Sequence, residues 1–464
     1  MAAFFIATTL STLAIMALIT GIELGLVPIS LPVPPARRGE MMQAPPPGLV
    51  PVVYDDAFDP NSTDLRAAAR HFAGDDRIAG VETVAVAPNG TLALINKFGE
   101  VFLADPQGAG AYSAPRLAAR IAPGRSLGAK FDAAGHLLVC NGPLGLVMIS
   151  GGAGAPPRQA LLTARVSDDS PLAAGRPIEF ANSLDIASDG RVYFSHSTDL
   201  APFRMPDGTW NPLDSVFVSL GQSAPSGMLL RYDPASRRTA ALAAGLWYAN
   251  GVALSAGEDF VLVADSLQAK VFRHWLQGPR AGATEPFIEN LPGPPDGVTR
   301  AADGGFWVTI FTHFPGVMKF SASRLMRAAM TWCPPALRPK LQPMGLVLKL
   351  SPAGDYEFSL ADPGGSMVAG VTSAVEGVGG ELWLGGLHAR GAAALDLAAA
   401  LRGKARGGGA AGAAAAALLG RIDAAAAAAA ELAAAAAAGG EEVQQQGAGG
   451  AQEAEGSGED RSEL

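Results

Sequence analysis

A turn-centred segment recurs six times along the chain, and this repeat constrains the fold more than any other feature. In each copy an alternating apolar stretch runs into a tight turn, and the turns are centred on Gly90, Gly135, Gly190, Gly257, Gly304 and Gly380. The alternation of Leu184 with Ile186 before a turn, and of Val192 with Phe194 after it, predicts two strands joined as a hairpin. The repeat therefore predicts an all-β structure built from similar units.

The distance between turns indicates which repeat architecture the units form. Successive turns are roughly 45 to 75 residues apart, which suits units of about four strands and is too long for ankyrin or leucine-rich repeats. The 57 glycines and 35 prolines, with little helical periodicity before the C-terminal region, agree with an all-β repeat protein. Six units of about four strands predict a six-bladed β-propeller, which we place at residues 61–397.

Four of the six copies carry a polar residue about eight positions ahead of the turn, in the segments GVETVAVAPNG, FANSLDIASDG, YANGVALSAGED and PPDGVTRAADGG. These residues are Glu82, Asn182, Asn250 and Asp296. If each segment is the innermost strand of a blade, the four side chains converge at the central channel. Leu127 and Thr372 occupy the same position in the other two copies, and we expect both to line the channel.

Two carboxylates and two carboxamides form an oxygen-only ligand set with a formal charge near −2. Such a set suits Ca²⁺, which takes ~6–8 oxygen ligands, better than zinc, which prefers His and Cys. Water would supply the remaining ligands. The alternative is that each side chain only caps the loop before its strand through hydrogen bonds. The shared register favours a common metal site, because unpaired carboxylates crowded into a narrow channel would repel one another.

Three longer runs carry a family resemblance. The runs FANSLDIASDGRVYFSHST, GMLLRYDPASRRTAALAAGLWYANGVALS and FRHWLQGPRAGATEPFIENLPGPPDGVTRAADGGFWVT resemble the strictosidine synthase-like family, and the likeness spans roughly residues 55–397. That family is similar to the six-bladed propellers that include paraoxonases, diisopropylfluorophosphatase and gluconolactonases, which hold calcium at the channel with a Glu, Asn and Asp set. The resemblance implies the same role here for Glu82, Asn182, Asn250 and Asp296.

The chain also departs from the family pattern. Strictosidine synthase itself condenses an amine with an aldehyde using a glutamate in its sixth blade, and Thr372 stands at the matching position. A threonine cannot take a proton from a protonated amine at neutral pH, so this condensation is disfavoured. Gly297 replaces a common asparagine after Asp296, which removes one possible amide. Cys140-Asn141 replaces Ala-Asp, which neutralises a carboxylate near the channel.

Calcium at the channel favours the hydrolysis of lactones, aryl esters or phosphotriesters, because the metal polarises the reacting oxygen and stabilises the oxyanion. Attack would come from an activated water or directly from a metal-bound carboxylate, for which Asp296 is the candidate. His196, His313 and His388 follow inner-strand segments and are candidate bases, with His196 preferred, although such histidines are often hydrogen-bonding or surface residues. The competing hypothesis is a noncatalytic propeller in which structural calcium pins the blades and a face binds protein or lipid.

Composition excludes several other functions. A net charge of −9 without a basic stripe argues against nucleic acid as a partner, which leaves a small ester or lactone as the expected one. No GxGxxG, P-loop, CxxC, HExxH or GxSxG motif supports a phosphate-cofactor, zinc or serine-elbow mechanism. Cys140 is expected to be a buried strand thiol. A disulfide between Cys140 and Cys333 remains an alternative, so the cysteines do not settle the compartment.

Residues 1–33 are apolar for long enough to cross a bilayer and predict a signal peptide or a membrane anchor. Arg37 and Arg38 follow this segment, which would leave an uncleaved anchor with its propeller in the cytosol, whereas members of the resembled family place theirs in the lumen. Both topologies stay open. We expect an endomembrane location, in the endoplasmic reticulum, vacuole or secreted, with residues 34–60 as a proline-rich linker.

Two further segments lie outside the repeat pattern. The connection between Gly304 and Gly380 is long, and its basic, partly amphipathic stretch predicts a lid, a membrane-surface contact or a helix packed on the propeller face. Residues 398–464 are dominated by alanine and glycine and predict frayed helix or disorder without chemistry. We expect the ring to close through an N-terminal strand near residues 52–54 or through blade-one material.

Overall fold

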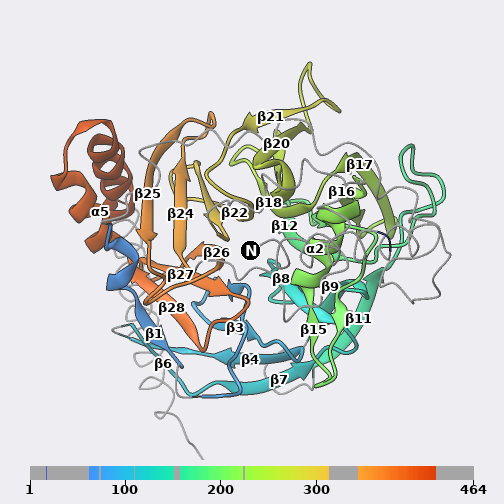
Figure 1. Cartoon of the computed structure of the whole chain (residues 1–464), viewed down its shortest axis with the longest axis horizontal. Helices are drawn as coiled ribbons and strands as arrows, with labels where there is room; N and C mark the ends of the chain where they lie inside the picture. Colours follow the sequence, from blue (N-terminus) through green and yellow to red (C-terminus); the bar gives the residue numbers. More distant parts are fainter. Residues whose placement is uncertain are drawn as a thin grey trace, which may run out of the picture. The chain divides into compact units, whose positions relative to one another are not determined.

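The computed structural model describes residue 17 and residues 62–72, 75–108, 110–150, 157–222, 225–312 and 343–424 of the chain. Within these ranges six four-stranded antiparallel sheets are arranged around a central channel (Figure 1). The predicted six-bladed β-propeller is confirmed. The first strands of consecutive sheets contact one another in a closed ring, so they form the wall of the channel.

The first three blades run outwards from the channel in chain order. Blade one consists of β2 (Val84–Val86), β3 (Leu92–Ile95), β4 (Glu100–Ala104) and β7 (Arg116–Arg120). Blade two consists of β8 (Arg125–Phe131), β9 (Leu137–Gly142), β10 (Gly145–Ser150) and β11 (Arg158–Thr163). Blade three consists of β12 (Ala181–Ile186), β13 (Val192–His196), β16 (Gly227–Asp233) and β17 (Arg238–Leu246).

The last three blades follow the same plan. Blade four consists of β18 (Ala249–Leu254), β19 (Phe260–Asp265), β20 (Lys270–Trp275) and β21 (Thr284–Ile288). Blade five consists of β22 (Pro295–Arg300), β23 (Phe306–Ile310), β24 (Gly345–Leu350) and β25 (Tyr356–Asp362). Blade six consists of β26 (Val371–Glu376), β27 (Glu381–Gly386), β28 (Ala392–Asp396) and β1 (Ala69–His71).

The ring closes through β1, which pairs antiparallel with β28 as the outermost strand of blade six. An N-terminal closing strand was expected, but the strand is Ala69–His71, and residues 52–54 lie outside the described ranges. The 3-10 helix η3 (Asp64–Ala67) precedes it and is held against blade five, where Arg66 Nε lies 3.1 Å from Asp362 Oδ1. The segment before β1 therefore ties blade five to the closure.

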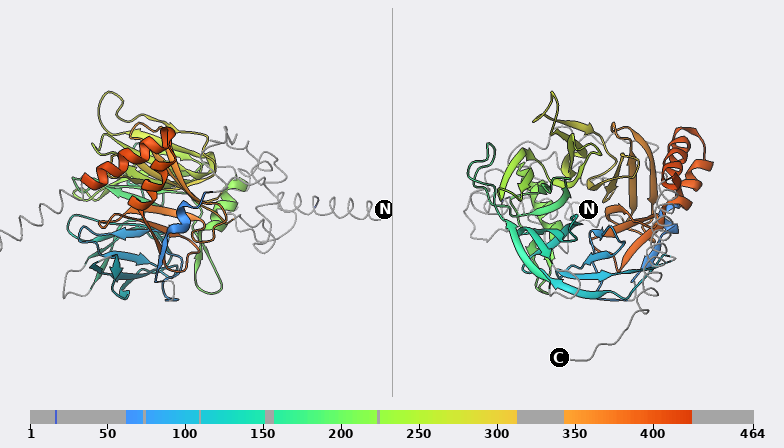
Figure 2. Two further views of the ribbon diagram at one scale, coloured as in Figure 1. Left: turned by 90° about the vertical axis from the view of Figure 1, so that its left-hand side faces the viewer. Right: turned by 180° about the vertical axis from the view of Figure 1, so that it is seen from behind.

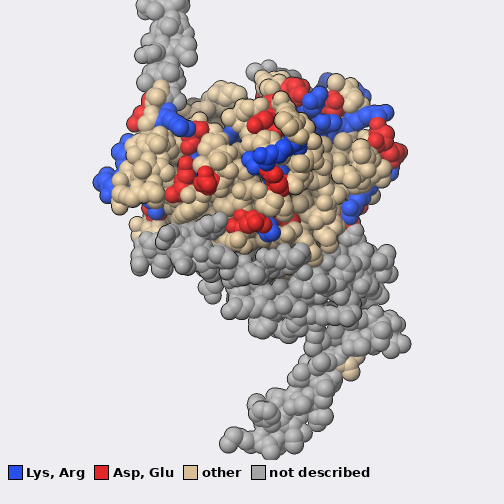
Figure 3. Space-filling view, turned by 90° about the horizontal axis from the view of Figure 1, so that it is seen from above, with Lys and Arg blue, Asp and Glu red and all other residues tan. Residues whose placement is uncertain are grey.

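Smaller elements interrupt this pattern. The ribbons β5 (Pro106–Gly108) with β6 (Ala111–Tyr112) and β14 (Phe203–Arg204) with β15 (Trp210–Asn211) lie in loops of blades one and three. The helix α2 (Pro212–Gln222) follows β15, and the 3-10 turn η4 (Ser266–Gln268) joins β19 to β20. Acidic and basic side chains are interspersed on the face that Figure 3 shows.

Apolar side chains fill the spaces between blades, because alternate residues of a strand face opposite neighbours. Both faces of a blade are covered, so strands such as β19 are buried at every position and read as continuous apolar runs. Between blades four and five, Leu262, Val271, Phe306 and Leu348 belong to one buried cluster. The core is therefore a series of inter-blade layers.

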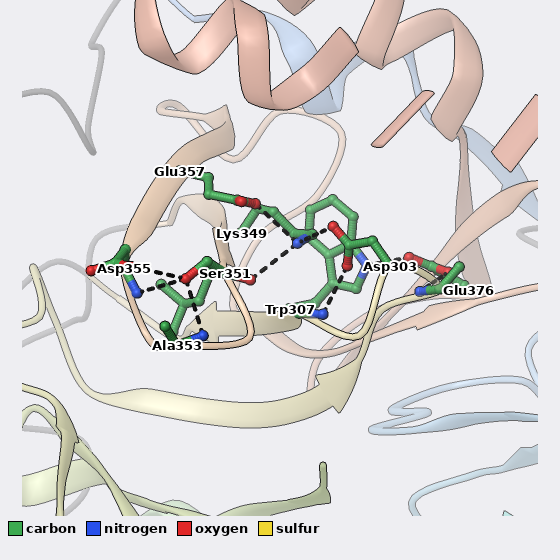
Figure 4. A network of polar contacts seen from close by, with 11 residues as sticks. Asp303, Trp307, Lys349, Ser351, Ala353, Asp355, Glu357 and Glu376 are labelled. Carbon is green, nitrogen blue, oxygen red and sulfur yellow. Dashed lines mark hydrogen bonds and ion pairs between the residues drawn. The ribbon is translucent and has the colours of Figure 1, made fainter. Parts of the chain in front are cut away.

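Lys349 interrupts the apolar run of β24 with a fully buried charge (Figure 4). Its Nζ lies 2.8 Å from Asp303 Oδ2 and 3.0 Å from Glu357 Oε2, and it donates to the carbonyl of Leu350 at 3.0 Å. Next to this group, Trp307 Nε1 donates to Glu376 at 2.6 Å. All three ammonium hydrogens of Lys349 thus have acceptors.

The described residues that follow Ala400 belong to a second unit of the chain. The helix α5 (Leu397–Arg406) leads into it, and residues 409–424 are helical again. The rest of the predicted tail is outside the described ranges, as are His313, Cys333 and the amphipathic stretch of the long connection. The apolar segment 1–33 also lies outside these ranges, apart from residue 17. No helix in the described part of the chain is both long and apolar enough to cross a bilayer.

Candidate metal centre

The residues at the six predicted channel positions border two cavities that adjoin inside the propeller. The first has a volume of about 100 Å³ and the second of about 380 Å³. Both cavities are bordered by Glu82, Asn182, Asn250 and Asp296. Leu127 borders only the first cavity and Thr372 only the second. The structure therefore brings the four predicted ligands together where the cavities meet.

A β-bulge accompanies this position in blades two to six. The pairing of first and second strands shifts between Ser126 and Ala129, Ala181 and Leu184, Ala249 and Val252, Pro295 and Val298, and Val371 and Ser373. A bulge leaves residues outside the ladder and changes the direction of their side chains. Gly297 follows Asp296 in one bulge, and a Cβ there would lie 2.4 Å from the Thr372 carbonyl oxygen. An asparagine at this position would therefore require the backbone to move.

The two asparagines are held with their amide nitrogens turned to serines. Asn182 Nδ2 donates to Ser197 Oγ at 2.9 Å, and Asn250 Nδ2 donates to Ser266 Oγ at 3.2 Å. Each serine hydroxyl in turn donates to a backbone carbonyl of the next blade at 2.6 Å. Because the hydroxyl hydrogen is already committed, each serine can only accept from the asparagine. The Oδ1 atoms of the two asparagines are therefore the amide oxygens that remain available to a cation.

Glu82 is buried, and its Oε2 atom has no hydrogen-bond partner among the described residues. Burial raises the pKa of its carboxyl to about 7, against the opposing effect of the Arg125 charge. Its backbone carbonyl accepts hydrogen bonds from Thr372 Oγ1 and Ser373 Oγ, both at 2.7 Å. The hydroxyl of Thr372 is thus used in a contact with the backbone of blade one. The condensation of an amine with an aldehyde would need a carboxylate at this position, and threonine does not supply one.

Asp296 faces the same space. Burial raises the pKa of its carboxyl well above the usual range, the negative charge of Glu82 raises it further, and the Asn250 amide offsets part of the increase. Among the described residues, three or more His, Cys, Asp or Glu side chains do not gather anywhere into a metal site. The candidate centre has two carboxylates, one of them with an orphaned oxygen, and two amide oxygens. This donor set fits Ca²⁺, which would relieve the repulsion between the carboxylates.

Arg125 is a channel-side residue that the sequence analysis missed. It stands two positions before Leu127 in β8 and is only 1% exposed, with Nη2 donating to the carbonyl of Gly80 at 2.7 Å. Its Nε and Nη1 atoms have no partner among the described residues. Gly80 has a φ of +68°, and a Cβ there would lie 2.8 Å from the Leu387 carbonyl oxygen. A glycine is therefore needed where the guanidinium reaches blade one.

The structure does not bring His196 to either cavity. Its side chain is fully buried, with Nε2 at 3.0 Å from Asp199 Oδ1 and Nδ1 accepting from the Phe180 amide at 3.4 Å. Both ring nitrogens have partners, which favours a role in holding the loop after β13. His388 is exposed in the loop after β27, beside the cavity residue Leu387.

The polar end of β9 also lies near the centre. Asn141 Nδ2 donates to Ser126 Oγ at 3.0 Å, whereas its buried Oδ1 has no partner in the described structure. Cys140 is free and buried as expected, and burial together with the Glu82 charge raises the pKa of its thiol well above the usual range. A thiol in this state is a poor nucleophile.

The two cavities differ in character. Beyond the four shared residues, the first is bordered mainly by apolar side chains, several of them from α2. The second is bordered by the inner strands and by the charged residues Lys130, Asp185, Arg300 and Glu376. The candidate centre therefore separates an apolar cavity from a polar one.

Comparison with known proteins gives relatives in sequence. The strictosidine synthase family matches residues 182–279. The adipocyte plasma membrane-associated protein of Gallus gallus is 31% identical over 270 residues, which cover 56% of this chain and 61% of that protein. The chain thus spans about three fifths of that relative. The strictosidine synthase-like 10 protein of Arabidopsis thaliana is 30% identical over 271 residues, covering 56% of this chain and 67% of that protein.

Among solved structures, a gluconolactonase from Xanthomonas campestris matches with a TM-score of 0.47 and 16% identity. The match covers 69% of this chain and 86% of that one. A likeness of this degree does not bear on the reaction.

Proposed function

The chain belongs to the strictosidine synthase-like family, and from that premise we propose that it is a calcium-dependent hydrolase of lactones or aryl esters. The observation that carries the proposal is the meeting of four oxygen-bearing side chains at the base of an apolar cavity. Metal ligands beside an apolar cavity are typical of hydrolytic sites, whereas a purely structural ion needs no cavity beside it.

The ligands would be Glu82, Asn182, Asn250 and Asp296. Calcium held there would polarise the carbonyl oxygen of a bound ester and stabilise the charge that develops on it. Ser197 and Ser266 keep the amide oxygens of the two asparagines directed to the centre before any ligand arrives. This pre-organisation means that the centre needs little rearrangement during the reaction.

The two carboxylates would have different roles. Glu82 lies in the field of Arg125, which favours its ionised form and suits it to hold the metal. Burial raises the pKa of the Asp296 carboxyl, and the negative charge of the nearby Glu82 raises it further. We therefore assign Asp296 as the group that takes the proton of the attacking water at a carboxylate oxygen, with direct attack by Asp296 as the variant of this route.

A noncatalytic propeller with structural calcium is the second candidate. The observation in its favour is that no histidine borders either cavity in the described part of the chain. In this case the ion would pin blades one, three, four and five through the same ligands, and a propeller face would bind a protein or a lipid.

Hydrolysis of a panel of lactones and phenyl esters by the purified full chain, with calcium and after chelation, separates the two candidates. The hydrolase predicts turnover that chelation abolishes and added calcium restores. The structural alternative predicts no turnover and a lower Tm after chelation. If neither turnover nor Tm responds to chelation, the metal centre itself is wrong.

We also propose that the chain is associated with the endomembrane system through residues 1–33. The support is the apolar composition of this segment and the name of the vertebrate relatives, which assigns those proteins to the plasma membrane of adipocytes. Fractionation of cells that express the chain with and without residues 1–33 tests the association. N-terminal sequencing of the mature protein would distinguish a cleaved signal peptide from an anchor.

A further inference from the structure

Resting on the proposed hydrolase function, we propose that the substrate is a neutral ester or lactone with an apolar alkyl or aryl substituent, and that α2 determines this preference. Polyhydroxylated or anionic lactones would then be poor substrates. The argument depends on the residues that border the first cavity and on how α2 is held beside it.

The helix α2 presents one apolar face to the first cavity. Leu213, Val216, Phe217 and Leu220 border the cavity and follow the i, i+3, i+4, i+7 spacing of a single helical face. The helix is inserted in blade three between β13 and β16, and Figure 2 shows it at one face of the propeller. It is thus an addition to the blade that shapes this end of the channel.

The other side of α2 fixes the helix to the propeller loops. Ser215 Oγ donates to the Ala201 carbonyl at 2.9 Å, Ser219 Oγ donates to Thr198 Oγ1 at 3.0 Å, and Val218 is fully buried. The face that borders the cavity is less covered, since Leu213, Val216 and Phe217 are only partly buried. Apolar side chains in this state gain further burial when an apolar ligand enters.

The cavity has further apolar lining residues outside α2. Tyr248, Leu267 and Leu387 come from loops of blades four and six, and the first two belong to one buried cluster with Leu220. Apart from Glu82 and Asp296, the described residues that border this cavity carry no charge. Without a basic side chain among these described residues, this part of the wall offers no counter-ion to an anionic substrate.

The polar groups of this cavity are mostly committed. Ser266 Oγ accepts from Asn250 and donates to the Pro295 carbonyl, and the hydroxyl of Tyr248 lies beside Ser197. The hydroxyl groups of a sugar lactone would leave water and find few replacement partners along α2. A hydrocarbon substituent meets no such cost, and each buried methylene should raise the apparent affinity about fourfold.

The test is a substrate series with the calcium-loaded full chain. Measured kcat/KM for γ-lactones that bear hydrogen, propyl or hexyl substituents should rise about fourfold per methylene until the cavity is filled. The γ-lactone form of gluconolactone, which has the same ring size as the series, should fall at least about tenfold below the unsubstituted γ-lactone, because its buried hydroxyls would go unpaired. Equal or faster turnover of gluconolactone would overturn the inference and leave the hydrolase proposal standing.

The variant Phe217→Ser assigns the preference to α2, with Phe98→Ser as the matched control. Phe98 is 50% exposed and borders neither cavity, so its replacement should leave the dependence on chain length unchanged. Phe217→Ser should flatten that dependence mainly through KM. If this variant does not fold, Val216→Thr nearly keeps the volume and exchanges one methyl group for a hydroxyl. Unchanged selectivity in every folded cavity variant would refute the role of α2.

Binding of γ-hexyl lactam, which resists hydrolysis, keeps this inference separate from the proposed function. Calorimetry with the wild-type chain should give binding that weakens at least about fivefold in Phe217→Ser and stays unchanged in Phe98→Ser. If no ester or lactone is hydrolysed but the lactam binds in this way, the hydrolase proposal fails and the apolar ligand stands. If the lactam does not bind, the inference fails whatever the turnover.

Discussion

The buried charged groups of blade five have a complete set of polar partners, whereas those of the channel do not. Lys349 lies in the interior with two carboxylates and a carbonyl within 3.0 Å. Glu82 is buried and Asp296 is partly buried, but they repel each other, and one oxygen of Glu82 has no hydrogen-bond partner in the described structure. The network of Lys349 is complete, whereas the unmet hydrogen bond and the repulsion in the channel are the observations behind the proposed calcium site. The contrast supports a structural role for the first group and the proposed ligand-binding role for the second.

Replacing Asp296 by asparagine should give the largest effect on activity. We expect kcat to fall on the order of 10²–10³-fold, because a carboxylate is lost from both metal binding and proton transfer. In calcium-free protein the Tm should stay equal or rise, since the repulsion with Glu82 disappears. Steady-state kinetics and thermal unfolding with and without calcium check both parts. A lower Tm in the absence of calcium would contradict the proposed incompleteness of the channel group.

Replacing Lys349 by methionine should lower the free energy of unfolding by about 3 kcal/mol, because Asp303 and Glu357 lose their counter-ion. Urea unfolding measures the change. Lys270→Met is the control, because Glu289, its partner at 2.6 Å, is 43% exposed and the pair should contribute less than about 1 kcal/mol. Calcium affinity should not change. A change in calcium affinity would mean that the two buried groups are coupled.

The stability of the calcium-free protein should fall as pH rises from about 4.5 to about 7. The carboxyl of Glu82 has a pKa of about 7 in the folded chain, against an ordinary value of 4.5 in the unfolded chain. Between these two pH values the folded chain therefore binds more protons than the unfolded chain. The contribution lost is about 3 kcal/mol at most. Urea unfolding of the chelated wild type and of Glu82→Gln at pH 5 and pH 7.5 isolates it. An equal pH dependence in both proteins would refute the assignment.

Replacing Ser197 by alanine should have the smallest effect. The Asn182 amide would lose its fixed orientation, and calcium affinity should weaken about fivefold, equivalent to about 1 kcal/mol. Calcium titration by calorimetry measures the change. Ser215→Ala is the control, because that serine also donates to a carbonyl but holds α2 instead of a metal ligand. Equal affinities in both variants would show that the serines do not orient the centre.

Much of the fold, and the residues of the candidate centre, can be predicted from the sequence. The alternating strands and glycine turns predicted six blades, and the shared register brought Glu82, Asn182, Asn250 and Asp296 to one place. The closing strand β1 was predicted only in kind, because its short run Ala69–His71 carries no turn-centred signal. His196, the preferred candidate base, lies away from both cavities for a related reason. The position of a residue in a strand does not reveal which loop covers the end of that strand.

The contact of Arg125 and the apolar face of α2 could not be predicted from the sequence. Arg125 is separated from Gly80 by 45 positions in the sequence. Its guanidinium reaches the Gly80 carbonyl only because blades one and two are neighbours in the ring. The apolar face of α2 lies in an insertion of blade three that lacks the repeat pattern, and other residues that line the same cavity come from blades four and six.

The number of blades, the candidate channel positions and the four oxygen-bearing side chains follow from the sequence, because strand alternation and turn residues are local properties that repeat along the chain. The pairing of charges, the burial of His196 and the lining of the cavity beside the candidate centre follow from the folded ring. Those features depend on contacts between blades that are distant in sequence. Their burial and unmet hydrogen bonds arise when the ring closes.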